Sequence, residues 1–239
     1  MDNLIFDCDG VLVDSEAIAE ATLLELLGEW LPDLAARAEL KAALGMTTAN
    51  ILDHLEARSA YRLPTDAAAR VDGAIEARLA DELRPVDGVA AVLDALELPL
   101  AVVSNSRRQR VLASLATTGL DARLGDIPII TADQVAQPKP DPAIYRLAAE
   151  RLCCAPGDCL VVEDSVSGVT AAHGAGMTVI GFTGASHVPP GQGERLRQAG
   201  AWRILPHMQG LEALVQQWRE GRPSTPGAPQ HHRTTRTRA

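Results

Sequence analysis

The sequence predicts an α/β protein whose doubly wound parallel sheet is interrupted, after its first strand, by an all-helical segment. One observation is a short apolar strand, Leu4 to Phe6, which runs directly into two aspartates. Another is a long stretch, 16–84, with helical periodicity and almost no strand signal. A third is the regular alternation of short apolar strands with helices from Pro85 onward, which is typical of a parallel sheet covered on both faces.

Each element follows from a local pattern. In the first part of the chain, apolar residues recur at i, i+3 and i+4 spacing between Gly and Pro breaks, which predicts helices at Ala17 to Trp30, Leu34 to Leu44, Thr48 to Arg58 and Thr65 to Leu83. Continuous apolar runs predict strands at Leu100 to Val103, Ile127 to Thr131, Cys159 to Val162 and Thr178 to Phe182, with helices beginning near Gly88, Arg107, Asp141, Ser165 and Gln192. We therefore place a core at 1–15 and 85–221 and a helical cap at 16–84.

Composition limits the function classes. With 239 residues and 46% hydrophobic content, the chain can bury a large core. A net charge of -9 argues against a nucleic-acid-binding body, and no apolar run approaches the ~20 residues that cross a membrane. The four cysteines include the adjacent pair Cys153 and Cys154, which suits neither a disulfide framework nor a zinc site. The apolar run at residues 3–6 is too short for a signal sequence, so we expect a cytoplasmic protein with reduced thiols.

The C-terminal segment 222–239 has a different character. It contains Pro, Thr, Arg and Gly, with no acid and no apolar periodicity. Such a segment cannot bury enough apolar surface to fold, so we expect a disordered basic tail. A neutral extension is the favoured interpretation, and contact with nucleic acid is the alternative.

The two aspartates that follow the first strand predict a metal-binding site. Asp7 and Asp9 lie two residues apart at the carboxyl end of the first strand, where open α/β sheets place their ligands. Clustered carboxylates repel each other unless a cation or a shared proton relieves them, and Mg²⁺ is a suitable oxygen-ligated ion. A calcium-binding EF-hand loop is excluded, because its ligand and glycine positions hold Val11, Leu12 and Ile18.

Three further motifs also follow predicted strands. Ser104 and Asn105 precede a helix start, so hydroxyl, backbone N–H groups and helix dipole can hold an anion, although a serine here is also an ordinary N-cap. Lys139 is bracketed by prolines that fix its backbone, and a surface turn is the alternative for it. Glu163 and Asp164 follow a buried strand, where acids need a cation or a helix start to be stable.

In their order along the chain, the motifs DCDGVLVDSE, VVSNS, PKPDP and VVEDSVSG resemble those of the haloacid dehalogenase superfamily. The similarity is to its phosphatase branch with a helical cap inserted after the first strand, which includes sugar phosphatases and β-phosphoglucomutase-like enzymes. It spans residues 3 to about 220 and implies a Rossmann-like core. It also implies that Asp7 is the nucleophile and Asp9 the general acid and base.

The same resemblance implies two sets of ligands. Those for Mg²⁺ would be the Asp7 carboxylate, the Asp9 backbone carbonyl and Asp164. Glu163 would either bind the metal directly or lie just outside these ligands. Those for the phosphoryl oxygens would be Ser104, the Asn105 amide and Lys139. An anionic nucleophile can approach an anionic phosphorus only if cations neutralise the phosphoryl oxygens, which is why these residue types are needed together.

We therefore expect a Mg²⁺-dependent phosphatase that hydrolyses a small phosphorylated metabolite, a sugar or sugar-acid phosphate, through an aspartyl-phosphate. We expect it to act without nucleic-acid or membrane partners, as a monomer or weak homodimer. A β-phosphoglucomutase-like mutase is the alternative, but Ala19 and Thr48 stand where such mutases usually carry histidine and arginine. A non-catalytic metabolite-binding module is the remaining alternative. The cap loop with Gly45, Thr47 and Thr48 either contacts substrate, as in relatives, or is a plain helix end.

Overall fold

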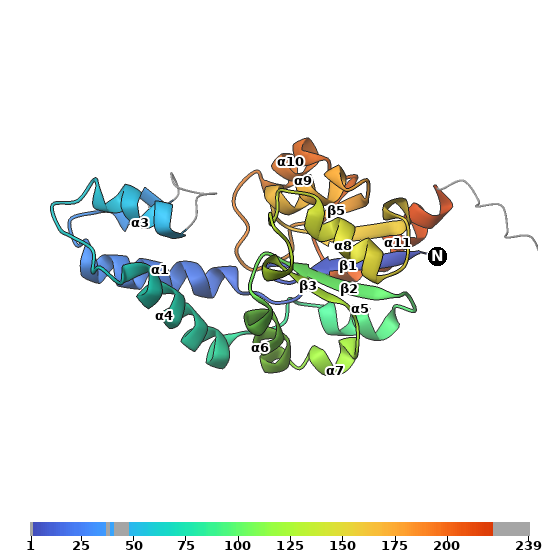
Figure 1. Cartoon of the computed structure of the whole chain (residues 1–239), viewed down its shortest axis with the longest axis horizontal. Coiled ribbons are helices and arrows are strands. Elements are labelled where there is room, and N and C mark those ends of the chain that lie inside the picture. The colour runs from blue at the N-terminus through green and yellow to red at the C-terminus, as the bar shows by residue number, and fades with distance from the viewer. Residues whose placement is uncertain (1, 37–38, 41–47, 222–239) are drawn as a thin grey trace, which may run out of the picture.

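A computed structural model describes residues 2–36, 39–40 and 48–221 of the chain, and Figure 1 shows their arrangement. Six parallel strands form one sheet in the order β3-β2-β1-β4-β5-β6. The strands are β1 (Asn3–Asp7), β2 (Leu100–Ser104), β3 (Ile129–Thr131), β4 (Cys159–Glu163), β5 (Thr178–Phe182) and β6 (Arg203–Leu205). The doubly wound, Rossmann-like α/β fold predicted from the sequence is therefore confirmed.

The first strand lies in the middle of this sheet. Leu4 pairs with Leu100 of β2 on one side and with Leu160 of β4 on the other, so β1 joins one segment about 100 residues away in sequence and another about 156 residues away. All five residues of β1 and of β4 are buried, which explains why both strands are continuous apolar runs rather than alternating ones. Since the strands are parallel, their carboxyl ends meet at one edge of the sheet.

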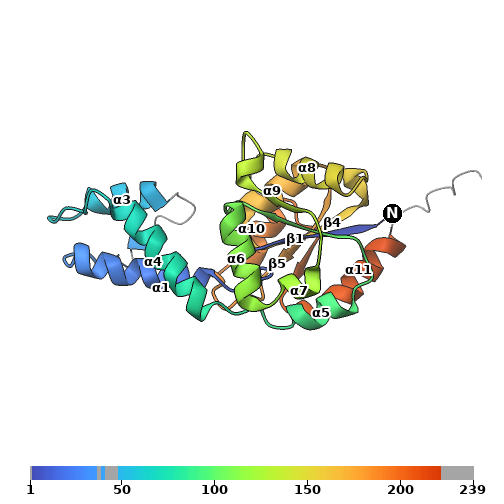
Figure 2. The same ribbon diagram turned by 60° about the horizontal axis from the view of Figure 1, so that its bottom comes forward.

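Helices cover both faces of the sheet. One face packs against α5 (Val89–Ala95), α6 (Arg108–Thr118), α7 (Asp121–Leu124) and α11 (Leu211–Glu220). The other packs against α8 (Ala143–Arg151), α9 (Val166–Gly174) and α10 (Gln192–Ala199). Figure 2 shows α8, α9 and α10 together on one side of the sheet and α5, α7 and α11 on the other. Short 3-10 helices occupy Ala132–Gln134, Pro156–Asp158 and Met208–Gly210.

The segment between β1 and α5 forms a helical layer to one side of the sheet (Figure 1). Its elements are α1 (Glu16–Trp30), α3 (Thr48–Glu56) and α4 (Ala67–Glu82). They pack through buried apolar residues such as Leu27, Leu55 and Val71. In the described part of 16–84 the regular elements are all helices, whereas most of the helix expected at Leu34 to Leu44 lies outside the described residues.

Two connections join this helical layer to the sheet. They run side by side, because the Asp14 N–H donates to the Arg84 carbonyl and the Val86 N–H to the Leu12 carbonyl, both at 3.0 Å. The division into a core and a cap is our interpretation of this arrangement. None of the described helices is both long and apolar enough to cross a membrane.

Candidate active site

The residues singled out in the sequence converge at the carboxyl edge of the sheet. Asp7 ends β1, Ser104 ends β2 and Glu163 ends β4, and these three strands are direct neighbours. Lys139 reaches the same place from the proline-rich loop before α8, where its Nζ lies 2.5 Å from Asp7 Oδ1 and 2.6 Å from Glu163 Oε1. Segments distant in sequence thus build one charged cluster.

Lys139 is buried and its ammonium group is fully hydrogen-bonded. Besides the two carboxylates, Nζ donates to the Val103 carbonyl at 3.3 Å. Burial alone would lower the pKa of Lys139, but the charges of Asp7 and Glu163 outweigh that effect and raise the pKa well above its usual value. The lysine is therefore a fixed cation beside Asp7.

The Asn105 side chain holds the backbone of Lys139. Its Oδ1 accepts from the Lys139 N–H at 3.0 Å, and its Nδ2 donates to the Lys139 carbonyl at 3.2 Å. Two reciprocal bonds leave little freedom for the loop that carries the lysine. The sequence suggested only a phosphate contact for Asn105, whereas the structure also gives its side chain this positioning contact.

Glu163 is fully buried, and both of its carboxylate oxygens are occupied by protein donors. Oε1 accepts from Lys139 Nζ and from the Tyr145 hydroxyl at 3.0 Å, while Oε2 accepts from the Ser165 N–H and hydroxyl at 2.9 and 3.0 Å. Gly168 leaves room for this carboxylate, because a Cβ there would coincide with it. These contacts make Glu163 the counter-ion that positions Lys139.

Asp9 points into a group of hydroxyls. Its Oδ1 accepts from Ser15 at 2.8 Å, and its Oδ2 accepts from Ser106 at 2.8 Å and Ser104 at 3.3 Å. The Ser104 hydroxyl in turn accepts from the Ser106 N–H at 2.9 Å. Arg110 of α6 contributes a cation, with Nη2 3.7 Å from Asp9 Oδ1. The carboxylate of Asp9 is thus held beside Asp7 by groups from β2, α6 and the start of the helical segment.

Three carboxylates lie close enough to hold one cation among the described residues. Ligand oxygens of Asp7, Glu163 and Asp164 are within 4.8 Å of one another. Burial raises the pKa of both Asp7 and Asp164 well above the usual 3.8, and the neighbouring acids raise both further, while the charge of Lys139 offsets only part of this rise. Gly10, at φ +76°, gives Asp164 its place, since a Cβ there would collide with the Asp164 carboxylate. The fit to a divalent metal is good, because a cation would remove this repulsion.

The loop after β5 also touches this region. The Ser186 N–H donates to Asp14 Oδ2 at 3.2 Å, and His187 Nε2 lies 2.8 Å from Glu20 Oε2 in α1. Both contacts join the core to the beginning of the helical segment.

The candidate substrate loop cannot be placed in the same way. Gly45 and Thr47 lie outside the described residues, and Thr48 is the first residue of α3. Conversely, the structure brings in five residues that sequence reasoning did not assign: Ser15, Ser106, Arg110, Tyr145 and Ser165. Ser15, Ser106 and Ser165 lie within the quoted motifs, and Ser165 also had a helix-start signal, since its hydroxyl accepts from the Gly168 N–H as the N-cap of α9.

A doubly wound sheet that places a buried lysine, a strand-end aspartate and an acidic cluster able to hold a cation at its carboxyl edge is suited to phosphoryl transfer, and the class it indicates is the hydrolases of phosphoric monoesters. Residues 4–182 match the haloacid dehalogenase-like hydrolase family. The chain belongs to this family.

Individual relatives agree with this assignment. The chain is 31% identical over 188 residues to the 6-phosphogluconate phosphatase of Escherichia coli, a match that covers 78% of this chain and 85% of the relative. A haloacid dehalogenase-like protein of unknown function from Agrobacterium tumefaciens superposes with a TM-score of 0.83 at 37% identity, covering 91% of this chain and 98% of that one. A family hydrolase from Deinococcus radiodurans, solved with bound phosphate and sodium, gives a TM-score of 0.79 at 30% identity, covering 91% and 96%.

Proposed function

We propose that this protein is a Mg²⁺-dependent phosphatase that hydrolyses a small phosphorylated sugar or sugar acid through an aspartyl-phosphate on Asp7. The observation that carries the proposal is the pairing of Asp7 with the buried cation Lys139, 2.5 Å away, beside Asp9 at the same strand end. The similarity to a 6-phosphogluconate phosphatase supports the substrate class.

The metal ligands in this proposal are Asp7, the Asp9 backbone carbonyl and Asp164. Glu163 stands behind them, since its oxygens are bonded to Lys139, Tyr145 and Ser165. When bound, Mg²⁺ supplies positive charge that screens the phosphoryl oxygens from the attacking carboxylate.

In the first half-reaction, a carboxylate oxygen of Asp7 attacks phosphorus and the bond from phosphorus to the ester oxygen breaks. Asp9 gives its proton to the departing oxygen, so the leaving group departs as a neutral alcohol. Lys139 neutralises charge that spreads over the phosphoryl oxygens, with Ser104 and the Asn105 amide as further donors. The product of this half is a phosphorylated Asp7.

In the second half-reaction, Asp9 takes a proton from a water molecule whose oxygen attacks the same phosphorus. The bond between phosphorus and Asp7 breaks, inorganic phosphate leaves and the Asp7 carboxylate is restored. Asp9 is then protonated again, ready for the next ester. Substrate choice falls to groups outside this centre, and the loop with Gly45, Thr47 and Thr48 is our candidate for contact from the helical segment.

The test is phosphate release from a panel of phosphorylated sugars, sugar acids and an aryl phosphate, with Mg²⁺ and with excess EDTA. We expect turnover that requires Mg²⁺ and that Asp7→Asn abolishes, because an amide is a poor nucleophile. Full turnover in EDTA would contradict the mechanism. Conversion of β-glucose 1-phosphate to glucose 6-phosphate, faster than phosphate appears, would instead indicate a mutase.

A further inference from the structure

Arg110 lies beside the proposed general acid, and one of its donors is unsatisfied. Its Nε is buried and has no hydrogen-bond partner among the described residues. Its nearest acidic neighbour is the Asp9 carboxylate, 3.7 Å from Nη2, which is too long for a hydrogen bond. A buried donor without an acceptor is costly and is usually satisfied by a ligand or an ordered water. A ligand that offers an acceptor to this partly exposed guanidinium would satisfy it.

Arg110 lies next to the proposed general acid, which places its guanidinium near the ester oxygen of the leaving group. Asp9 must come within about 3 Å of the ester oxygen to protonate it. Because Arg110 Nη2 is 3.7 Å from Asp9 Oδ1, the guanidinium then lies within about 7 Å of that oxygen. A group a few bonds along the leaving alcohol can reach it. Lys139, in contrast, is buried against Asp7 on the phosphoryl side.

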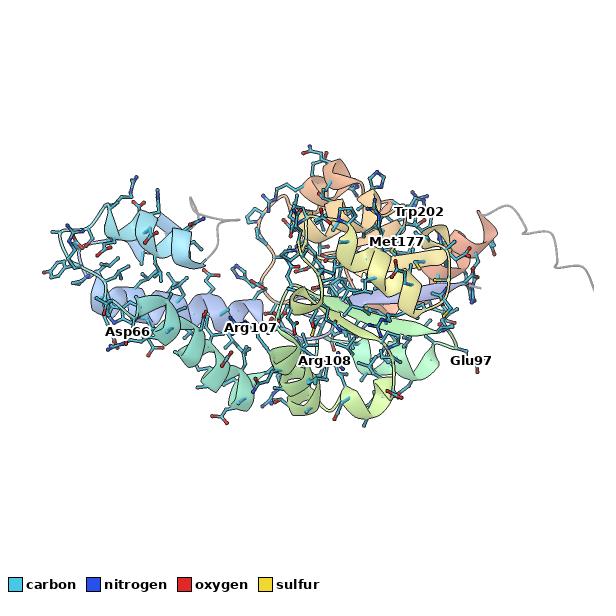
Figure 3. All side chains as sticks on the ribbon, viewed as in Figure 1. Asp66, Glu97, Arg107, Arg108, Met177 and Trp202 are labelled. Atoms are coloured by element: carbon cyan, nitrogen blue, oxygen red, sulfur yellow. The ribbon has the colours of Figure 1, made fainter. Side chains whose placement is uncertain are left out.

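Helix α6 brings Arg110 to this place from the core side. The helix begins at Arg108, directly after the loop that follows Ser104 and carries Ser106, and it packs near α4 of the helical segment. Figure 3 shows Arg107, the residue before α6, on the side of the core that faces α1 and α4. The side chain of Arg110 is 30% exposed, so a ligand can contact it.

We propose that Arg110 binds a carboxylate on the leaving group, so that the enzyme prefers phosphorylated hydroxy acids, including sugar acids, to the matching neutral polyol phosphates. This inference rests on the proposed phosphatase function. The planar guanidinium matches a carboxylate with two parallel hydrogen bonds.

The charges around Arg110 favour a carboxylate over a second phosphate. Asp9 is its ion-pair neighbour, and Glu16 at the start of α1 also interacts with both Asp9 and Arg110. Two acids repel a dianion more strongly than a monoanion. A carboxylate therefore meets the lower electrostatic cost in this place.

The experiment compares kcat/KM for two matched pairs of esters: 3-phosphoglycerate against glycerol 3-phosphate, and 6-phosphogluconate against glucitol 6-phosphate. Within each pair only the carboxylate differs. We expect the wild type to prefer the acid in at least one pair, and Arg110→Gln to lower that preference by about tenfold or more, as expected for loss of a charge-assisted hydrogen bond. Arg110→Lys keeps the charge but cannot make two parallel hydrogen bonds to a carboxylate, so we expect an intermediate preference for the acid.

Two controls separate this role from a structural one. Arg108→Gln removes the same charge from the same helix turn, but the Arg108 guanidinium donates to the Ile129 carbonyl at 2.8 Å, away from Asp9, so we expect the preference to persist. Turnover of an aryl phosphate reports whether the phosphoryl centre of each variant still works.

The outcomes are distinguishable. An unchanged acid preference in an Arg110→Gln protein that still hydrolyses the aryl phosphate would overturn the inference. So would a wild type that hydrolyses both members of each pair equally, which leaves the phosphatase function standing. A preference for a sugar bisphosphate that disappears in Arg110→Gln would assign the site to phosphate instead. A wild type without Mg²⁺-dependent phosphatase activity would contradict the proposed function itself.

Discussion

Replacing Gly168 by alanine is a sharp test of the buried ion pair behind the site. Gly168 lies in the first turn of α9, directly over the Glu163 carboxylate, and a Cβ there would occupy the position of that carboxylate. The carboxylate must move, and it cannot do so without disturbing its bonds to Lys139 and Tyr145. One added methyl group therefore disrupts the hydrogen bonds and the ion pair of Glu163.

The magnitude follows from two opposing effects. Disrupting one partner of a buried ion pair costs about 3–5 kcal/mol. Alanine in a helix is better than glycine by about 1 kcal/mol. We therefore expect Gly168→Ala to lower the free energy of unfolding by about 2–4 kcal/mol, which lowers the Tm of a chain of this size by roughly 5–15 °C.

Gly174→Ala in the same helix is the matched control. A Cβ at Gly174 would meet nothing nearer than Pro142 Cβ at 3.8 Å, an ordinary contact. Helix propensity then acts alone and favours alanine by up to about 1 kcal/mol. Differential scanning calorimetry of both variants gives the answer. Equal Tm values for the two would refute the claim that Gly168 exists to make room for Glu163.

Three more predictions concern the acidic cluster and the Lys139 loop. Mg²⁺ should raise the Tm of the wild type, and Asp164→Asn should lose most of that shift in a thermal melt, because a ligand is lost and the repulsion is already relieved. Because burial raises the pKa of Asp7 and Asp164 above 3.8, the metal-free folded protein binds more protons than the unfolded chain between that value and the raised pKa values. The contribution of these two groups to the free energy of unfolding should thus rise as pH falls through that window. The rise in Tm that Mg²⁺ produces should shrink over the same range. A Mg²⁺-induced rise in Tm that grows toward acid pH would contradict the assignment. Asn105→Ala should lower kcat about 5- to 30-fold, which corresponds to about 1–2 kcal/mol in activation free energy, because the Lys139 backbone loses both hydrogen bonds. Unchanged steady-state kinetics would show that these two bonds are dispensable.

The strands that could be predicted share one physical cause. Strands buried on both faces must be continuous apolar runs, so β1, β2, β4 and β5 were all recognisable in the sequence. The edge strand Arg203–Leu205 was not, because it has only three residues and its arginine is exposed. The last helix, Leu211–Glu220, was also not assigned from the sequence.

Some contacts of the site could be predicted from the sequence and others could not. The proximity of Asp7, Lys139 and Glu163 could be predicted. Asp7 and Glu163 end strands and Lys139 precedes a helix, and these ends lie at the carboxyl edge of a parallel sheet. The contact from Tyr145 to Glu163 could not, since it depends on how α8 packs against β4 across 18 residues of sequence. Arg110 was missed for the same reason: its approach to Asp9 crosses about a hundred residues and leaves no local pattern.

The most direct measurement of the central claim is the mass of the Asp7 peptide during turnover. In the Asp9→Asn variant, an aryl phosphate with a good leaving group should still phosphorylate Asp7, while attack by water is slow because the base is missing. Rapid acid quench, proteolysis and mass spectrometry should then find one added phosphoryl group on the peptide that contains Asp7, and none when Asp7→Asn is combined with it. A phosphoryl group on another residue, or hydrolysis by the wild type with no phosphorylated enzyme at any time point, would contradict the account.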